Sequence, residues 1–133
     1  MRGASALEDL LRRTPETSLH VFVVWEPVLW TDLAPPLSSV LARLSDSRVR
    51  QVWDRRRLVS AGLLRVLDAG HAGGVGADPP EQDGIVWDTV AIYPPGVVWG
   101  DSMPAPGFVD GPVIRVIGEV ARRLASPAAP PRR

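Results

Sequence analysis

The stretch LHVFVVWEPVLWTDLAPP, residues 19–36, decides the fold that the sequence predicts. Its first part, Leu19 to Trp25, is a nearly unbroken β-branched and aromatic run. Such a run predicts a strand covered on both faces, as in a parallel or mixed sheet. The chain then passes two acids and a second tryptophan before it meets a double proline. This layout is typical of a strand that leads through a loop into a helix, and such loops often carry function in α/β proteins. We call the segment from Trp25 to Pro36 the corner.

Apolar spacing predicts helices on both sides of this strand. Ser5 and Glu8 form a capping-box pattern, and leucines follow it at helical spacing. After the corner, and twice more later in the chain, apolar residues recur every three or four positions. Residues 49–54 fit either a short strand or part of a helix. The predicted helices span residues 5–13, 36–44, 55–67 and 112–125.

The second half of the chain predicts a hairpin and a closing helix. Residues 85–93 and 97–99 read as antiparallel strands joined by a Pro-Pro-Gly turn. The glycine- and proline-rich loop before them, residues 68–84, is long for a compact domain. Strands that alternate with helices and end in a hairpin indicate an α/β layered domain with a mixed central sheet. We expect one domain over residues 1–125 and a disordered Pro/Arg-rich tail over residues 126–133.

The composition excludes several kinds of chemistry. The chain has no cysteine, which excludes disulfides, thiolate nucleophiles and cysteine-ligated metals, and every basic residue is arginine, which excludes Schiff-base lysines. The two histidines, His20 and His71, have no ligand-like neighbours at metal spacing, so we expect no metal and no other cofactor. The 15 basic residues balance the 15 acidic ones, and no stretch has the ~20 apolar residues of a membrane span. We therefore expect a cytoplasmic protein that binds neither nucleic acid nor membranes.

Three segments together resemble the thioredoxin-like fold family. Residues 21–44 resemble the family's segment in which a central strand passes through a WCGPC motif into a long helix. Residues 84–100 resemble its C-terminal β-hairpin, and residues 112–124 stand where its last helix packs across the sheet. The resemblance covers about residues 19–124. It implies a single-domain thioredoxin-like fold with a mixed central sheet, a C-terminal hairpin and flanking helices.

The departures from the family pattern determine what this resemblance implies for function. In one alignment Thr31 and Ala34 occupy the two cysteine positions of the motif, and in another Leu29 and Asp32 occupy them. Neither alignment supplies a thiol, so the resemblance implies a redox-inactive member. Thiols supplied by a partner are the remaining route to a redox role.

The leading functional hypothesis is a binding or scaffolding module that holds a protein partner or a small ligand at the corner. Trp30 is the best single contact if it is exposed, although burial against the loop is the more favoured placement. Trp87 and Asp88 begin the hairpin strand that neighbours the corner in the family's sheet, near the place of the family's cis-proline. The candidate binding residues are Trp25, Glu26, Trp30, Thr31, Asp32, Trp87 and Asp88.

The alternative hypothesis is a small acid/base enzyme that uses Glu26, Asp32 or Asp88. Carboxylates that meet at a strand end can share a proton, which raises the pKa of one of them. A structural role is the favoured interpretation of these acids. In that role Asp32 caps the helix that begins near Pro35, while Glu26 faces water.

Arginines form the densest run of charge in the chain, at Arg55, Arg56 and Arg57. With Arg48 and Arg50 they predict a local basic patch that can hold a phosphate or an acidic partner. The favoured interpretation is a solvated helix face whose charge is neutralised locally.

Overall fold

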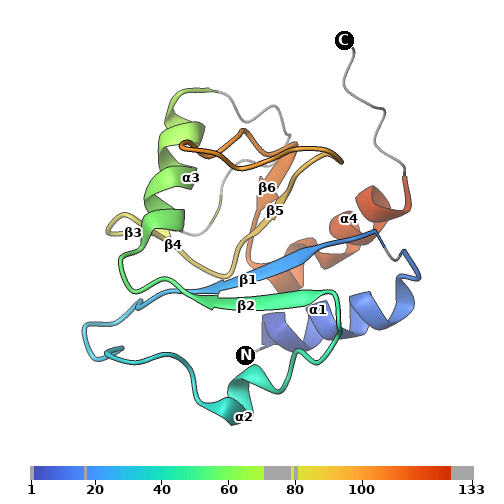
Figure 1. The fold of residues 1–133 in the computed structure, drawn as a ribbon, viewed down its shortest axis with the longest axis horizontal. Coiled ribbons are helices and arrows are strands. Elements are labelled where there is room, and N and C mark those ends of the chain that lie inside the picture. Colours follow the sequence, from blue (N-terminus) through green and yellow to red (C-terminus); the bar gives the residue numbers. More distant parts are fainter. Residues whose placement is uncertain (1, 17, 71–78, 80, 127–133) are drawn as a thin grey trace.

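The computed structural model describes residues 2–16, 18–70, 79 and 81–126, which form a mixed α/β structure (Figure 1). Residues 127–133 of the predicted tail, and residues 71–78 and 80 of the predicted loop, lie outside the described residues. None of the described helices is long and apolar enough to cross a lipid bilayer. In chain order the elements are α1 (Arg2–Arg13), β1 (Val21–Trp25), α2 (Ser38–Leu41), β2 (Val49–Trp53), α3 (Leu58–Asp68), β3 (Glu81–Gln82), β4 (Ile85–Val86), β5 (Val90–Ile92), β6 (Phe108–Asp110) and α4 (Val113–Ala125).

The parallel pair β1–β2 lies at the base of the corner. Val21 stands opposite Val49, and Trp25 stands opposite Trp53, so the two strands end at the same edge. This register confirms a parallel strand pair and shows that residues 49–53 are a strand. The predicted coverage of both faces is wrong, because Phe22 is 68% exposed. Side chains alternate between the two faces of a strand, and α1 covers only the face that carries Val21.

The predicted mixed central sheet is wrong for the described residues, whose strands form three separate pairs, and the C-terminal antiparallel pair has a different second strand from the predicted hairpin. β4 turns back onto β3 through Asp83 and Gly84, which have φ angles of 54° and 75°. Positive φ at both central residues is the mark of the type I′ turn, which Asp-Gly favours. β5 pairs with β6, and residues 97–99 belong to no strand. Asp88, with φ of 48°, turns the chain between β4 and β5, so the two cannot form one strand.

The helices differ from their predicted bounds mainly at their starts. α1 begins at Arg2, so Ser5 lies inside the helix and does not cap it. α2 is a single turn, and its N-cap residue is Leu37. α3 begins at Leu58 rather than at Arg55, because the chain first makes a turn in which Arg57 adopts a left-handed φ of 57°. The predicted helix at the C-terminal end is confirmed as α4.

α1 contributes side chains to two apolar clusters. Leu10 belongs to the cluster that includes β6 and α4, and Leu11 belongs to the cluster that includes β2. Consecutive helical residues point about 100° apart, so one helix can serve both clusters. α1 also packs directly against α4 (Figure 1). The buried members of the two clusters are Leu10, Phe108, Val116 and Val120, and Leu11, Leu44 and Val49.

Arg48 fastens the end of α1 to the start of β2. Its guanidinium donates hydrogen bonds to the carbonyl oxygens of Leu11, Thr14 and Glu16, at 2.6, 2.7 and 2.8 Å. It also pairs with the Asp46 carboxylate at 2.7 Å. The hydrogen bonds from Arg48 lower the pKa of Asp46 to about 2. Arg48 therefore binds one carbonyl of the last turn of α1, that of Leu11, and two carbonyls of the segment that follows the helix.

Candidate functional site

The corner is a closed turn organised by Asp32. The Oδ2 atom of Asp32 accepts hydrogen bonds from the backbone N–H groups of Val28, at 3.0 Å, and Leu29, at 2.8 Å. The backbone N–H of Asp32 donates in return to the Leu29 carbonyl at 3.0 Å. The prediction that Asp32 caps the following helix is wrong, because its carboxylate points back along the chain and α2 begins only at Ser38. The turn therefore has its own internal hydrogen bonds.

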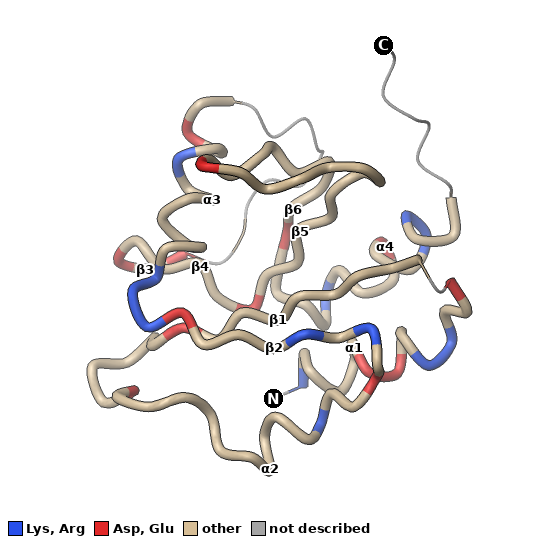
Figure 2. Tube along the Cα trace, in the orientation of Figure 1, with Lys and Arg blue, Asp and Glu red and all other residues tan. Residues whose placement is uncertain are grey.

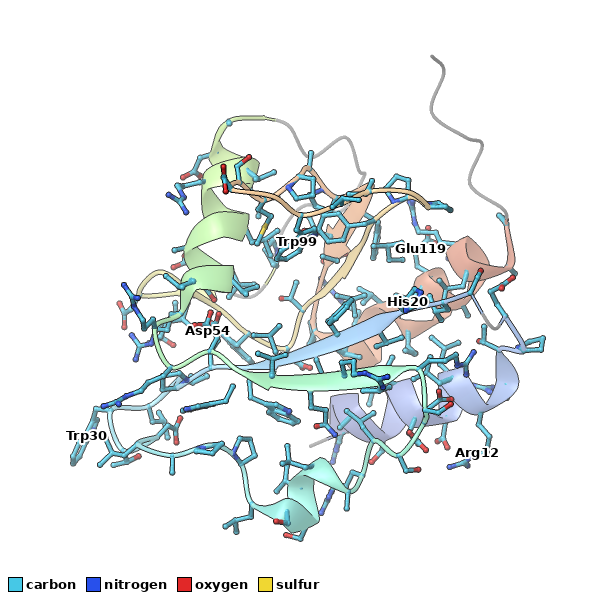
Figure 3. All side chains as sticks on the ribbon, viewed as in Figure 1. Arg12, His20, Trp30, Asp54, Trp99 and Glu119 are labelled. Atoms are coloured by element: carbon cyan, nitrogen blue, oxygen red, sulfur yellow. The ribbon has the colours of Figure 1, made fainter. Side chains whose placement is uncertain are left out.

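The outer side of this turn is apolar and exposed. Trp30 is 88% exposed, and Figure 3 shows it at the outer end of the corner, away from the helices and strands. The favoured prediction that Trp30 is buried against the loop is therefore wrong. Its neighbour Thr31 is also exposed. The tight turn directs these side chains outward. We call the exposed apolar residues of this segment the apolar knob, which consists of Val28, Leu29, Trp30 and Leu33.

Trp25 supports the corner from below instead of contributing to the apolar knob. Its indole Nε1–H donates to the Oε1 of Gln51 at 3.0 Å, and the Nε2 of Gln51 donates to the Leu41 carbonyl at 2.8 Å. These two hydrogen bonds connect β1, β2 and α2. Trp25 is partly buried, as expected for a ring whose polar tip has found a partner.

Glu26 joins the root of the corner to α3 and β4. Its carboxylate accepts hydrogen bonds from the Ser60 backbone N–H at 3.0 Å and from the Ser60 hydroxyl at 2.5 Å. The Ser60 Oγ accepts a third hydrogen bond from the Val86 backbone N–H at 3.0 Å. Ser60 is only 2% exposed, and Glu26 and Val86 are partly buried, so this network is partly shielded from water. The prediction that Glu26 faces water is wrong.

Asp54 is the acid that the structure places beside Glu26. It follows β2 as Glu26 follows β1, and its backbone N–H donates to the Trp25 carbonyl at 2.8 Å. Its Oδ2 accepts from the Val59 backbone N–H at 2.8 Å. Glu26 and Asp54 thus satisfy successive N–H groups in the first turn of α3, where negative charge is favourable.

The environment of Glu26 raises its pKa above the ordinary value of 4.5. The largest cause is burial, which penalises the ionised form, and the neighbouring Asp54 charge acts in the same direction. The hydrogen bonds from Ser60 act in the opposite direction and only partly offset burial. Glu26 therefore holds its proton more tightly in this structure than an exposed glutamate does.

The other two candidate acids are used elsewhere. Asp32 closes the turn, as described above. The backbone carbonyl of Asp88 accepts from the N–H of Val113 at 2.9 Å, and its carboxylate lies against Gly3. Asp88 therefore sits between the starts of α1 and α4. Trp87, before it, is half-exposed.

The arginines of the predicted basic patch do not gather in one place. Arg55 and Arg56 are exposed, beside the acidic residues that precede α3 (Figure 2). Arg57 turns inward, and its Nε–H donates to the Pro27 carbonyl at 2.9 Å. Arg48 is engaged at the end of α1. The start of α3 already holds the carboxylates of Glu26 and Asp54, and anion binding by Arg55 to Arg57 stays a prediction.

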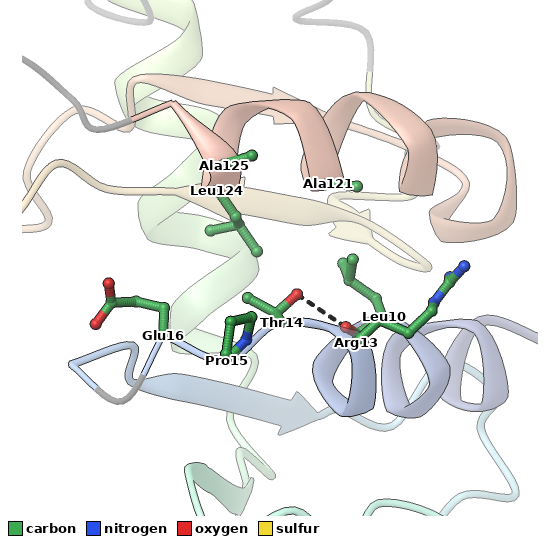
Figure 4. A pocket seen from close by; sticks show the side chains of 8 residues that line it. All are labelled: Leu10, Arg13, Thr14, Pro15, Glu16, Ala121, Leu124 and Ala125. Atoms are coloured by element: carbon green, nitrogen blue, oxygen red, sulfur yellow. Dashed lines mark hydrogen bonds between the residues drawn. The ribbon is translucent and has the colours of Figure 1, made fainter.

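An open hollow of about 690 Å³ lies between the C-terminal ends of α1 and α4 (Figure 4). None of the candidate residues from the sequence lines it. The Thr14 hydroxyl at its edge donates to the Leu10 carbonyl at 2.8 Å, so this polar group is already used. The lining residues are Leu10, Arg13, Thr14, Pro15, Glu16, Ala121, Leu124 and Ala125.

Sequence reasoning missed Asp54 and Ser60 as partners of Glu26. The signal was present, because VWE ends one strand and VWD ends the other, with the acid at the same position in each.

The described residues contain no group of three or more His, Cys, Asp or Glu side chains able to hold a metal ion. In comparisons with known proteins, no family model, no curated protein and no solved structure matches this chain.

Proposed function

We propose that this protein is a binding module whose apolar knob inserts into an apolar groove on a protein partner. The observation that carries the proposal is the 88% exposure of Trp30 on a turn closed by hydrogen bonds to Asp32. Tryptophan is enriched among the residues that dominate protein–protein binding energies. A turn that is already ordered also loses less conformational entropy when it binds.

The shape of the apolar knob favours a protein partner over a small ligand. Small-molecule sites are concave and surround their ligand. The knob is a projecting turn with Trp30 at its outer end (Figure 3), and its apolar side chains are exposed. A projecting indole requires a complementary groove, and a folded protein surface can supply one.

Redox inactivity and a thioredoxin-like fold belong to the same proposal. The chain has no cysteine, so it cannot carry out thiol–disulfide exchange by itself. The parallel pair β1–β2, connected through the corner and α2, supports the thioredoxin-like interpretation. Docking without electron transfer is the role that we propose for such a corner.

Site-specific photo-crosslinking in the cells that make this protein tests the docking proposal. A photoreactive amino acid replaces Trp30 in one variant and Val98, which is 82% exposed and outside the knob, in a matched control. We expect the position-30 variant to crosslink to one defined protein. Adding Leu33→Asp to that variant should abolish the product, since it places a charge in the knob. Equal products from both positions, or none from position 30, would contradict the proposal.

A second candidate function, general acid–base catalysis, is favoured by one observation. Glu26 has a raised pKa and an adjacent carboxylate in Asp54, which is an arrangement that enzymes use. The requirement is that reagents reach the Glu26 carboxyl. Labelling the folded protein at pH 5 with a water-soluble carbodiimide and a small amine tests this directly. Failure to label Glu26 while exposed carboxyls react would eliminate this candidate.

A further inference from the structure

One carboxyl group connects three segments that are distant in the sequence. Glu26 precedes the apolar knob by two residues, Ser60 lies in the first turn of α3, and Val86 belongs to β4. Hydrogen bonds of 3.0 Å and 2.5 Å join the first two, and one of 3.0 Å joins the last two. The position of the corner relative to α3 and β4 therefore depends on this carboxyl.

The charged groups around Glu26 are arranged asymmetrically. The Asp54 carboxylate faces it from the end of β2. From α3 it meets the N–H and hydroxyl of Ser60, and the adjoining Arg57 binds the Pro27 carbonyl through its Nε. From β4 the network receives the peptide group of Val86. Ionisation of Glu26 thus places a second negative charge beside Asp54 in a partly buried position, and this cost outweighs the favourable hydrogen bonds at the start of α3.

The same heavy atoms accommodate a protonated Glu26. The Ser60 Oγ lies 3.3 Å from the Val86 carbonyl oxygen, so its hydroxyl can rotate to donate there. Its oxygen is then free to accept the proton of the Glu26 carboxyl, while the Glu26 carbonyl oxygen still accepts from the Ser60 N–H. The proton comes from solvent, and every donor in the network keeps an acceptor.

We propose that Glu26 is a proton-operated latch, which holds the root of the corner onto α3 and β4 when protonated and weakens that hold when ionised. The latch is a property of the free chain and does not depend on a partner. Burial and Asp54 both raise the pKa of Glu26. A raised pKa means that the folded state binds the proton more tightly than the unfolded state does, so the stabilisation is complete below pH 4.5. It is lost as the pH rises through the pKa of the folded protein.

The chain contains a matched control for this latch. The Glu8 carboxylate accepts from the Ser45 backbone N–H at 3.1 Å and from the Ser45 hydroxyl at 2.8 Å. This is the same chemical pairing on an exposed surface. Replacing either glutamate with glutamine keeps an acceptor and a donor in place and removes only the titration.

Hydrogen exchange of the Ser60 and Val86 amides, corrected for intrinsic rates between pH 4.5 and pH 8, tests the proposal. In the wild type and in Glu8→Gln we expect protection of both amides to fall as the pH rises. In Glu26→Gln we expect this pH dependence to be lost and the protection to stay at its acidic level. Identical profiles in the wild type and Glu26→Gln would overturn the latch.

A second measurement keeps the proposal testable if Glu26→Gln does not fold. Carbon-13 NMR of the wild-type carboxyl groups gives the titration midpoint of Glu26 directly. The amide chemical shifts of Ser60 and Val86 are expected to titrate with that same midpoint. Amide shifts that stay constant while Glu26 titrates would overturn the proposal.

Discussion

Replacing Ser60 with alanine removes one hydroxyl group that connects three segments of the chain. The Val86 N–H loses its 3.0 Å acceptor, and the Glu26 carboxylate loses its 2.5 Å donor. An unsatisfied buried polar group costs about 1–3 kcal/mol. Because the hold of Glu26 on Ser60 is weakened when Glu26 is ionised, we count only the unsatisfied Val86 N–H and expect Ser60→Ala to lower the free energy of unfolding at pH 7 by about 1–3 kcal/mol.

Urea unfolding followed by tryptophan fluorescence measures this loss. The matched control is Ser5→Ala, because Ser5 is exposed on α1. A change at such a surface site is normally within about 0.5 kcal/mol. The denaturant dependence of the free energy should be the same in all three proteins. If Ser60→Ala and Ser5→Ala have equal stability, the Glu26–Ser60–Val86 network does not contribute as argued.

The other predictions concern the helices, the ion pair and the apolar knob. Gly118 in α4 has no atom within 4 Å of the position of an added Cβ, so calorimetry should show Gly118→Ala stabilised by about 1 kcal/mol. A Cβ at Gly3 would lie 2.7 Å from the Oδ1 of Asp88, so Gly3→Ala should lack this gain, and equal gains at both positions would refute the packing there. The Asp46 pKa of about 2 lies below the ordinary 3.8. The Asp46–Arg48 ion pair therefore makes its full contribution to the free energy of unfolding above pH 3.8 and loses it as the pH falls through 2. Acid titration of stability should show this loss in the wild type and not in Arg48→Gln. Trp30→Ala should change the free energy of unfolding by less than about 0.5 kcal/mol, and a larger loss would mean that the indole is buried.

Local patterns in the sequence predict the elements that depend on local information. The uninterrupted apolar run of β1 and the apolar stripe of α4 both appear as predicted. The sequence contains two turn signals, Asp83-Gly84 and Pro94-Pro95-Gly96, and the predicted hairpin places its turn at the second. The two-residue Asp-Gly turn forms a hairpin, and the other signal does not. A mixed central sheet would have required the parallel pair β1–β2 to hydrogen-bond to one of the antiparallel pairs, and no such pairing forms among the described strands.

The candidate site was only partly predictable for a related reason. The sequence indicates Trp30 as the best contact, but its exposure depends on hydrogen bonds from residues 28 and 29 to Asp32, and the sequence does not determine whether Asp32 accepts them. The partnership of Glu26 with Asp54 required knowing that residues 49–53 form a strand parallel to β1. That segment fitted a helix equally well. Ser60 carried no signal, because serine in a first helical turn is common.

The affinity of the chain for the protein crosslinked at position 30 tests the central claim most directly. Isothermal titration calorimetry would compare the wild type with Trp30→Ala and Val98→Ala, two variants of highly exposed apolar residues. Loss of a dominant contact costs at least about 2 kcal/mol, which corresponds to about a 30-fold rise in Kd. We expect Trp30→Ala to show at least this rise and Val98→Ala to bind as the wild type does. Equal Kd values for all three proteins would contradict the claim that the apolar knob is the binding surface.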